Sequence, residues 1–478
     1  GTVTNTVVRS GANRIHGAAY YVFQNTYLNA NTSEKALTRS PRNNDQLSQT
    51  GFVLDGPVYI PKLYNGHDKT FFMVAFERYA SHSAINYASR VPTQSERTGD
   101  FSDLCSSFNG SGLCTSGVQI YDPLSPIDSA GNRTTYFAGN VIPTSRLTAA
   151  GQSILSYYPL PNVPGASATG GNNYVATQTS YASTYPSIIV RLDQAIGSKN
   201  KLNVILFRSG LTQQGPHEGF PKEIGPGDCG VCFYHVYRNN RGGSLDDVHV
   251  FSSTMVLDSR LGVLFHPFGL VYPDNSGFDL SKIGMSSTGL PYASFPGINP
   301  SGYAQLPAAA RGQVSTNMTG ALEEVLTKTI KNHTLRFGFE GNLIRYNVQN
   351  PQSGYGALSF DSRFTQKNYQ TGDAASGNAV AALLLGSFSS ASYGITPAYA
   401  LQQIYIAPFV QDDWRVTRKL TVNLGFRWDY ESPFSERHNK QVAGFCTTCA
   451  SPLQSAVPGL TLNGGLQYTS GSNRYPFP

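Results

Sequence analysis

Charged residues and long apolar runs are both scarce in this 478-residue sequence. Asp, Glu, Lys and Arg make up 13% of the chain, about half of the roughly 25% usual in globular domains. The longest apolar run spans residues 379–385, well short of the roughly 18 residues that a membrane-spanning helix needs. If the chain meets a membrane, it must therefore do so with strands. The net charge of +6 comes without a dense basic run, so we expect no nucleic-acid partner.

The sequence also lacks recognisable catalytic motifs. It contains no GxSxG, no HExxH and no Gly-Lys pair of the kind that a P-loop requires. Adjacent carboxylates occur at three places, which are Asp246/Asp247, Glu323/Glu324 and Asp412/Asp413. Neighbours on a strand point to opposite faces, so none of these pairs is expected to form an acid–base dyad. We expect a protein that is not an enzyme, with no catalytic residues, no metal and no cofactor.

Glycine, proline and two aromatic residues are what the chain has in quantity. There are 48 Gly, 28 Pro, 28 Tyr and 26 Phe, against 4 Met and 2 Trp. This composition indicates a β-rich, turn-rich chain from outside the cytoplasm. The sequence opens at Gly1 on a polar segment without a signal peptide, from which we expect a truncated gene product or a fragment of a longer chain.

The six cysteines form three close pairs, which are Cys105/Cys114, Cys229/Cys232 and Cys446/Cys449. An even number and local spacing favour disulfides in loops exposed to an oxidising compartment. The alternative is a four-cysteine zinc site built from the two CxxC units. Those units lie more than two hundred residues apart, so disulfides are the preferred interpretation.

Eleven segments have the composition and alternation of β-strands. The clearest runs from Leu420 to Tyr430, where apolar and polar residues alternate without an error. The expected strands are residues 17–25, 49–58, 69–82, 186–196, 201–209, 242–252, 255–266, 320–331, 333–348, 402–414 and 420–431.

The gaps between these segments alternate in length. Short links such as 197–200, 253–254 and 415–419 alternate with long ones such as 83–185, 267–319 and 349–401. Short turns at one end and long loops at the other are typical of an up-and-down transmembrane barrel, whereas a soluble sandwich spreads its loops over both ends. Trp414 and Trp428 fall near opposite ends of neighbouring strands, where aromatic girdles are expected. All six cysteines fall in long loops, on the expected cell exterior.

Several stretches resemble the TonB-dependent outer-membrane receptors, and more narrowly their Oar-like kind with a carboxypeptidase-regulatory-like domain. They are "GTVTNTVVRSGANRIHGAAYYVFQN", "DGPVYIPKLYNGHDKTFFMVAFERY", "RVPTQSERTGDFS", "IYDPLS", "GNVIPTSRL", "YYPLPN", "NAVAALLLG" and "FVQDDWRVTRKLTVNLGFRWDY". The first resembles the end of the plug domain and the first barrel strand.

The resemblance implies an all-β fold, an antiparallel up-and-down transmembrane β-barrel. The chain would hold about half of a 22-strand barrel, about 11 strands with long extracellular loops. Residues 1–15 would be the C-terminal end of the plug domain and residues 16–478 the N-terminal half of the barrel. Expected partners are outer-membrane lipid, the TonB complex through a segment absent from this chain, and an unknown large substrate. Proline within a strand removes a ladder donor, so Pro408 leaves the pairing of its strand open.

Strand parity assigns candidate site residues. Residues expected to face the lumen are Arg336, Glu340, Asn342, Arg427 and Asp429, with solvated polar filler as the alternative. Residues expected to face lipid are Leu420, Val422, Leu424, Phe426 and Trp428. Loop tyrosines that could stack on a sugar or peptide are Tyr157, Tyr158, Tyr234 and Tyr237, with loop packing as the alternative.

The function that these expectations favour is a receptor or transporter of the bacterial outer membrane. It would move or sense a large substrate, an oligosaccharide or a peptide, and a role in export or surface signalling stays open. The alternative is a secreted all-β binding or structural protein whose apolar strand faces pack on each other. Extraction from outer membranes only by detergent would separate the two.

Overall fold

The computed structural model describes residues 8–31, 33, 37, 45–164, 171–216, 233–271, 278–287, 295–306, 313–349, 356–394 and 398–471. Strands predominate, and the helices that are described over their full length include the short α2 (Gln94–Arg97), α3 (Ala149–Leu155) and α4 (Ala379–Leu384). Among the described residues, none of the helices is long and apolar enough to cross a membrane.

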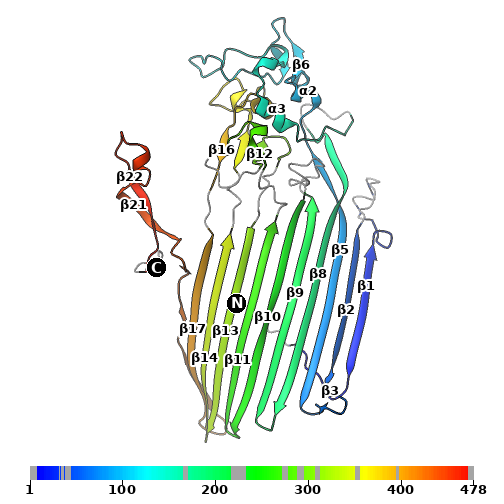
Figure 1. Ribbon diagram of the computed structural model, residues 1–478, viewed down its shortest axis with the longest axis vertical. Coiled ribbons are helices and arrows are strands. Elements are labelled where there is room, and N and C mark those ends of the chain that lie inside the picture. The colour runs from blue at the N-terminus through cyan, green and yellow to red at the C-terminus, as the bar shows by residue number, and fades with distance from the viewer. Residues whose placement is uncertain are drawn as a thin grey trace.

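Eleven strands follow one another through the main sheet in chain order. They are β1 (His16–Asn25), β2 (Gln46–Pro57), β5 (Thr70–Ser89), β8 (Tyr174–Ile196), β9 (Asn200–Pro216), β10 (Phe233–Ser252), β11 (Met255–Val271), β13 (Gln313–Ile330), β14 (His333–Gln349), β17 (Tyr399–Arg415) and β18 (Thr421–Arg427). Each pairs antiparallel with the next, and β1 and β18 end the path. The result is an open wall of tilted strands (Figure 1).

All eleven expected strands occur, so the all-β, up-and-down prediction is confirmed. Several strands are longer than predicted at the end next to the long connections. β8 begins at Tyr174 rather than at residue 186, and β10 begins at Phe233 rather than at residue 242. These extensions include runs such as Thr212–Gln213–Gln214, which are polar on both faces. Without an apolar face there is no alternation to detect.

Short and long connections lie at opposite ends of the wall (Figure 1). Tight links join β8 to β9, β10 to β11, β13 to β14 and β17 to β18 at one end, which we call the turn end. The small hairpin of β3 (Tyr59–Ile60) and β4 (Tyr64–Asn65) lies there too. The connections after β5, β11 and β14 lie at the other end, the loop end.

The sheet has two unlike faces. The inner face is the one on which residues 8–15 lie, where Ser10 donates to Asp193 at 2.8 Å and Arg9 pairs with Asp55 at 3.1 Å. The outer face carries a band of apolar side chains with more than a third of their surface exposed. This outer band is formed by Phe52, Leu54, Ile188, Val190, Leu192, Leu206, Leu245, Leu261, Val263, Leu322, Phe337, Ile404, Val410, Leu424 and Phe426. An apolar surface this wide and unpartnered needs a covering other than water.

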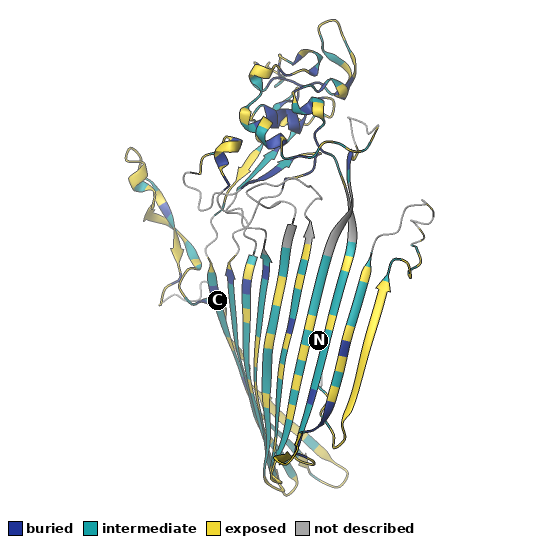
Figure 2. Cartoon of the chain, turned by 45° about the vertical axis from the view of Figure 1, so that its right-hand side comes forward, coloured by how far each residue is buried: buried dark blue, intermediate teal, exposed yellow. Residues whose placement is uncertain are grey.

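The three long connections fold together into a cap above the loop end. The cap comprises the described residues of 90–173, 278–306 and 356–394, and its one hydrophobic core draws on all three, as Phe101, Phe295 and Leu384 illustrate. Its elements besides the helices are β6 (Cys105–Phe108), β7 (Cys114–Gly117), β12 (Gly297–Pro300), β15 (Ala357–Phe360), β16 (Ser390–Ser392), η1 (Ser102–Leu104), η2 (Ala138–Asn140), η3 (Thr144–Arg146), η4 (Leu280–Ile283) and η5 (Ser362–Phe364). Buried segments concentrate in it (Figure 2).

Helix α4 forms the centre of the cap. Asn378 begins it, because its side-chain oxygen accepts from the backbone N–H groups of Val380 and Ala381. Alanine and leucine favour the helix, and Gly386 with φ of 70° follows its end. All six helical residues are buried, so the longest apolar run of the sequence is a core helix of the cap.

Pro408 interrupts one side of its strand. Towards β14 the pairing continues through Phe339 and Pro408. Towards β18, Trp428 donates to the Pro408 carbonyl at 3.1 Å, and the strand breaks until β19 (Tyr430–Glu431). Proline has no N–H, so it cannot donate the second hydrogen bond of an antiparallel pair. The expected strand 420–431 is therefore split, and β19 and β20 (Ser435–Glu436) each pair separately with β17.

A separate hairpin follows the main sheet. It consists of β21 (Val442–Ala450) and β22 (Asn463–Tyr468), with the one-turn η6 (Gln454–Ala456) between them. It forms a two-stranded sheet of its own beside the edge of the wall (Figure 1).

Candidate functional site

The N-terminal segment, residues 8–15, is held to the inner face by polar contacts at both of its ends. At one end, the Ser10 hydroxyl donates to Asp193 of β8, and Arg191 of β8 donates to the carbonyl of Val8. At the other end, the backbone N–H of Asp68 donates to the Asn13 side chain at 2.8 Å. Between them a Cβ on Gly11 would meet the Phe72 carbonyl oxygen at 2.6 Å. Only glycine allows this segment to lie so close to the sheet.

Charged side chains line the inner face next to this segment. Arg191 pairs with Asp193 at 2.7 Å, and Arg260 with Glu323 at 3.3 Å across β11 and β13. Arg191, Arg260 and Glu323, together with Asp246 of β10, border a cavity of 530 Å³ that Val8 of the N-terminal segment also lines. Each pair is partly solvated and contributes at most about 1 kcal/mol to stability. Their larger effect is to give the inner face a polar, hydrated surface.

A second polar cluster lies on the inner face near the β18 edge. The Arg427 guanidinium donates to Glu340 at 2.8 Å, to Asp429 at 2.9 Å and to the Tyr405 hydroxyl at 2.7 Å. The Tyr405 hydroxyl in turn donates to Asp429 at 2.5 Å. These residues come from β14, β17 and β18 and from the break that follows β18.

Three of the five residues expected to face the lumen thus meet in this cluster, namely Glu340, Arg427 and Asp429. Asn342 is next to it, with its amide 3.3 Å from Glu340. Arg336 lies on the same face of β14, two residues before Gly338 and closer to the turn end, and is exposed. Tyr405 was missed, although its place opposite Asn342 could have been found from strand register. Whether any of these residues contacts a substrate stays a prediction.

Of the residues expected to face lipid, Val422, Leu424 and Phe426 lie on the outer face of β18, Leu420 directly precedes this strand and Trp428 directly follows it. Leu424 stands opposite Asp412 and Phe426 opposite Val410. Leu420, Leu424, Phe426 and Trp428 are more than half exposed, and Val422 is half-buried. β18 is the edge of the path, so part of this exposure comes from its having one neighbour only.

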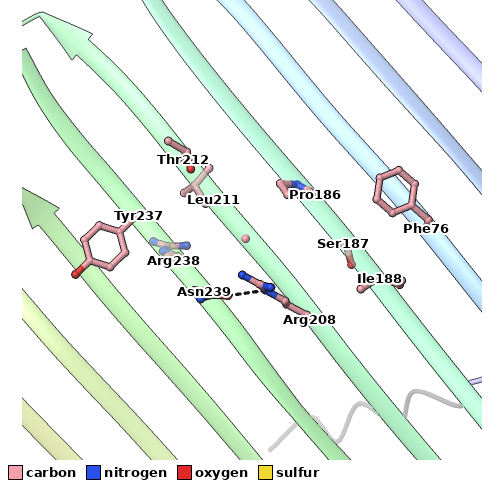
Figure 3. A pocket seen from close by; sticks show the side chains of 11 residues that line it. Phe76, Pro186, Ser187, Ile188, Arg208, Leu211, Thr212, Tyr237, Arg238 and Asn239 are labelled. Carbon is pink, nitrogen blue, oxygen red and sulfur yellow. Dashed lines mark hydrogen bonds between the residues drawn. The ribbon is translucent and has the colours of Figure 1, made fainter.

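Of the four tyrosines expected in ligand-binding loops, two lie in the long connection after β5 and two lie in strand β10. Tyr158 is 2% exposed in the core of the cap, where its hydroxyl donates to the Ala304 carbonyl at 2.8 Å. Tyr157 packs edge-on against Phe295. Tyr234 and Tyr237 belong to β10 and not to a loop, because the strand extends above the apolar band. Tyr237 lies on the outer face (Figure 3).

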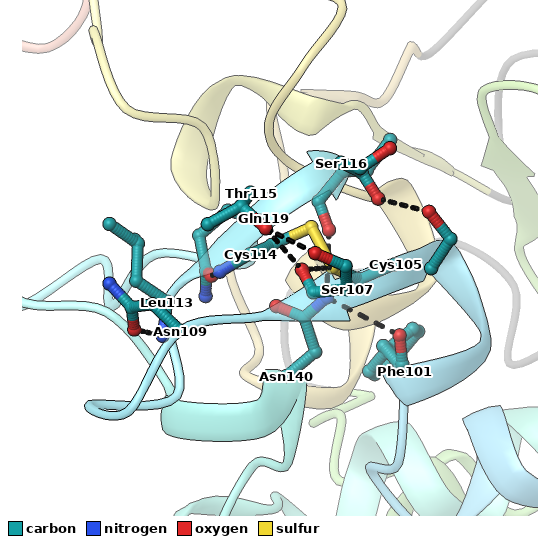
Figure 4. The surroundings of a disulfide bond; sticks show 12 residues. Phe101, Cys105, Ser107, Asn109, Leu113, Cys114, Thr115, Ser116, Gln119 and Asn140 are labelled. Atoms are coloured by element: carbon teal, nitrogen blue, oxygen red, sulfur yellow. Dashed lines mark hydrogen bonds between the residues drawn. A yellow bond between two sulfur atoms is a disulfide. The ribbon is translucent and has the colours of Figure 1, made fainter.

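Two of the three cysteine pairs lie among the described residues. Cys105 and Cys114 are joined by a disulfide that closes the β6–β7 hairpin of the cap (Figure 4). Cys446 is joined to Cys449 in β21. Cys229 and Cys232 lie outside the described residues. Within the described part of the chain, no group of three His, Cys, Asp or Glu side chains is placed to hold a metal ion.

A buried polar cluster in the cap was not found from the sequence. The Tyr303 hydroxyl donates to Glu96 at 2.5 Å and accepts from Arg90 at 3.0 Å and from Asn378 at 2.9 Å. Burial raises the pKa of Tyr303 far above its ordinary value. The cluster ties the first, second and third long connections together. Its members are more than two hundred residues apart in places, so no local pattern reveals it.

Comparisons with known proteins agree with this architecture. The family model described as an outer membrane beta barrel domain matches residues 7–476. No curated protein matches the sequence.

Among solved structures, the chain is similar to the outer membrane transporter YddB of Escherichia coli, with a TM-score of 0.41, 9% identity, and coverage of 89% of this chain and 41% of that one. For a ferric enterobactin receptor (PfeA) mutant from Pseudomonas aeruginosa, the TM-score is 0.36 at 10% identity, with coverage of 90% of this chain and 41% of that one. For the ferric-catecholate import receptor Fiu of E. coli K12, the TM-score is 0.28 at 10% identity, with coverage of 83% of this chain and 54% of that one. The chain spans about two fifths of the first two structures and about half of the third. The match of the family model over nearly its whole length shows that the chain belongs to the outer-membrane β-barrel family, and the protein lies in the bacterial outer membrane.

Proposed function

We propose that the protein is a TonB-dependent receptor of the outer membrane, of the Oar-like kind, which moves or senses a large substrate such as an oligosaccharide or a peptide. Residues 1–15 would then be the C-terminal end of the plug domain, and residues 16–478 the N-terminal half of the barrel around it. The TonB complex would act through a segment that this sequence does not contain. Membership of the outer-membrane family argues against the alternative of a secreted β-protein.

The observation that carries this proposal is that residues 8–15 bind to the polar inner face of the wall. Ser10 and Arg9 bond to Asp193 and Asp55, which stand on separate strands of the wall. These contacts are polar, and the Arg9 side chain is 62% exposed although its partner Asp55 is buried, so water can reach the segment's side of each contact and replace it. A plug that must shift for a substrate to pass needs contacts of this kind with the barrel.

The size of the substrate is inferred from the cap and the inner face. The cap is built from three connections with a common core, which provides a folded surface above the wall. Below it, the Arg427 cluster and the residues around Arg260 offer both donors and acceptors to a hydroxyl-rich or amide-rich chain. In this proposal Leu420, Val422, Leu424, Phe426 and Trp428 face lipid.

A disulfide cross-link tests where the plug lies. In the full-length protein, we expect S10C/D193C to cross-link on oxidation, because these side chains are hydrogen-bonded. The matched pair S10C/L192C should not, because Leu192 is the next residue of β8 and points to the outer face. Equal cross-linking in both pairs, or in neither, would contradict the seating of residues 8–15.

Uptake in living cells tests the transport role. Cells that express the full-length protein should accumulate a labelled oligosaccharide or peptide from a defined library, and a TonB-deficient strain should not. Oxidation of S10C/D193C should reduce uptake at least tenfold, and a thiol reductant should restore it. Accumulation that is independent of TonB would overturn the proposal while leaving the membrane location intact.

A further inference from the structure

A groove opens on the outer face of β8, β9 and β10 (Figure 3). It has a volume of 490 Å³ and is lined by Pro186, Ile188, Arg208, Gly210, Tyr237 and Asn239, among others. Gly210 has no side chain to fill the floor of the groove. A Cβ at this position would lie 3.7 Å from Pro186 Cγ, an ordinary van der Waals contact, so there is room for one. The groove lies on the outer face, away from the N-terminal segment and from both inner-face clusters.

Two arginines stand side by side here, one lining the groove and the other next to it on the neighbouring strand. Arg208 of β9 and Arg241 of β10 are direct cross-strand partners on the outer face, and both are exposed. Like charges in this position repel each other. Among the described residues, neither arginine forms an ion pair: Arg208 donates to the Asn239 side chain at 3.0 Å, and Arg241 lies 5.8 Å from the centre of the Phe265 ring. The pair therefore carries two uncompensated positive charges.

The arginines mark the upper limit of the apolar band. On the outer face of β9, Leu202, Val204 and Leu206 precede Arg208, and Gly210 and Thr212 follow it. Arg208 is eight residues above the start of the strand at Asn200. At about 3.3 Å per residue and a tilt of about 40°, this is about 20 Å above the turn end. A barrel's apolar band is about 25 Å tall, so the pair lies near the headgroups of the leaflet on the loop side.

We propose that this groove binds a phosphorylated lipid of the outer leaflet, with its phosphate between Arg208 and Arg241 and its acyl chains on the apolar surface below. Two guanidinium groups offer parallel N–H donors to phosphate oxygens, and the anion cancels their mutual repulsion. Ile188, which lines the groove, and Leu206, which lies next to it, are both exposed and give the acyl chains an apolar surface that a free anion could not cover.

Lipid binding by the full-length protein in detergent tests the proposal. We expect native mass spectrometry to show binding of diphosphorylated lipid A, about tenfold weaker after R208Q/R241Q. The control K201Q/R336Q removes two positive charges from the inner face and should bind as the unchanged protein does. G210L fills the groove without changing charge, and should also weaken binding. Retention of the folded, heat-modifiable form on gels shows that each variant keeps its barrel.

Four outcomes would overturn the proposal. One is unchanged affinity for lipid A in R208Q/R241Q. Another is an equal loss in K201Q/R336Q, which would mean that only net charge matters. The third is displacement of lipid A by millimolar inorganic phosphate, which would make the arginines a site for free anions. Binding of phosphatidylcholine as tight as that of lipid A would likewise remove the role of an anionic headgroup.

Discussion

At the scale of single residues, the buried hydroxyl of Tyr303 holds the polar centre of the cap. Tyr303→Phe removes the hydroxyl that Glu96, Arg90 and Asn378 share. Removing one partner from buried hydrogen bonds costs about 1–3 kcal/mol, so we expect the cap to open more often. Hydrogen exchange should be faster in residues 90–100 and 378–385 of the variant and unchanged in the strands.

The matched control for this change is Tyr136→Phe. The Tyr136 hydroxyl donates to Ser111 at 3.0 Å on the exposed surface of the cap, where water replaces the lost bond. The rate of hydrogen exchange in the cap of Y136F should equal that in the unchanged protein. If both variants exchanged alike, the buried cluster would have no special role in the cap.

The Asp122–Arg146 pair gives the cap a dependence on pH. Arg146 bonds to both oxygens of Asp122, at 2.6 and 2.7 Å, and this bonding lowers the pKa of the carboxyl. A carboxyl whose pKa is lowered on folding stabilises the fold above its ordinary pKa of about 3.9, and the contribution is lost as the pH falls through the folded value. Asp122→Asn should therefore weaken the cap by about 1 kcal/mol at pH 7.

The pH profile separates this effect from a general loss of packing. The difference in cap exchange between D122N and the unchanged protein should be constant from about pH 7 to pH 5 and should shrink below about pH 4. A difference that stayed constant down to pH 3 would show that the charge of Asp122 is not what stabilises the cap.

At the scale of elements, helix α4 decides whether the three long connections hold together. Ala382 is fully buried in it, and Ala382→Asp would place a carboxylate in the core without a partner, which costs several kcal/mol. We expect limited proteolysis to cut the cap in A382D while the strands stay folded and heat-modifiable. Ala374→Asp is the matched control, because Ala374 belongs to the same connection and is exposed. Equal cutting of both variants would contradict a core role for α4.

The elements also show how far the sequence alone reaches. Alternation from Leu420 to Phe426 predicted a strand because that signal is local, and the lengths of the gaps predicted which ends are loops. The cap could not be predicted in this way. The apolar residues 379–385 pack against partners such as Phe295 and Ile154, which lie far away in the chain. Predicting an inner-face pair such as Glu340–Arg427 requires the register of three strands. The alternation along one strand shows only which face a side chain is on, not which side chain on another strand it meets.

At the scale of the whole molecule, the two ends of the wall must lie on opposite sides of the outer membrane. The cap belongs outside the cell and the tight turns face the periplasm. Ser129 of the cap and Ser198 of the β8–β9 turn are both exposed. S129C should react with a membrane-impermeant maleimide in intact cells, whereas S198C should react only after the outer membrane is permeabilised. The protein without either substitution gives the background from its own cysteines. Labelling of S198C in intact cells would place the tight turns outside, and would then put Arg208 and Arg241 in the inner leaflet.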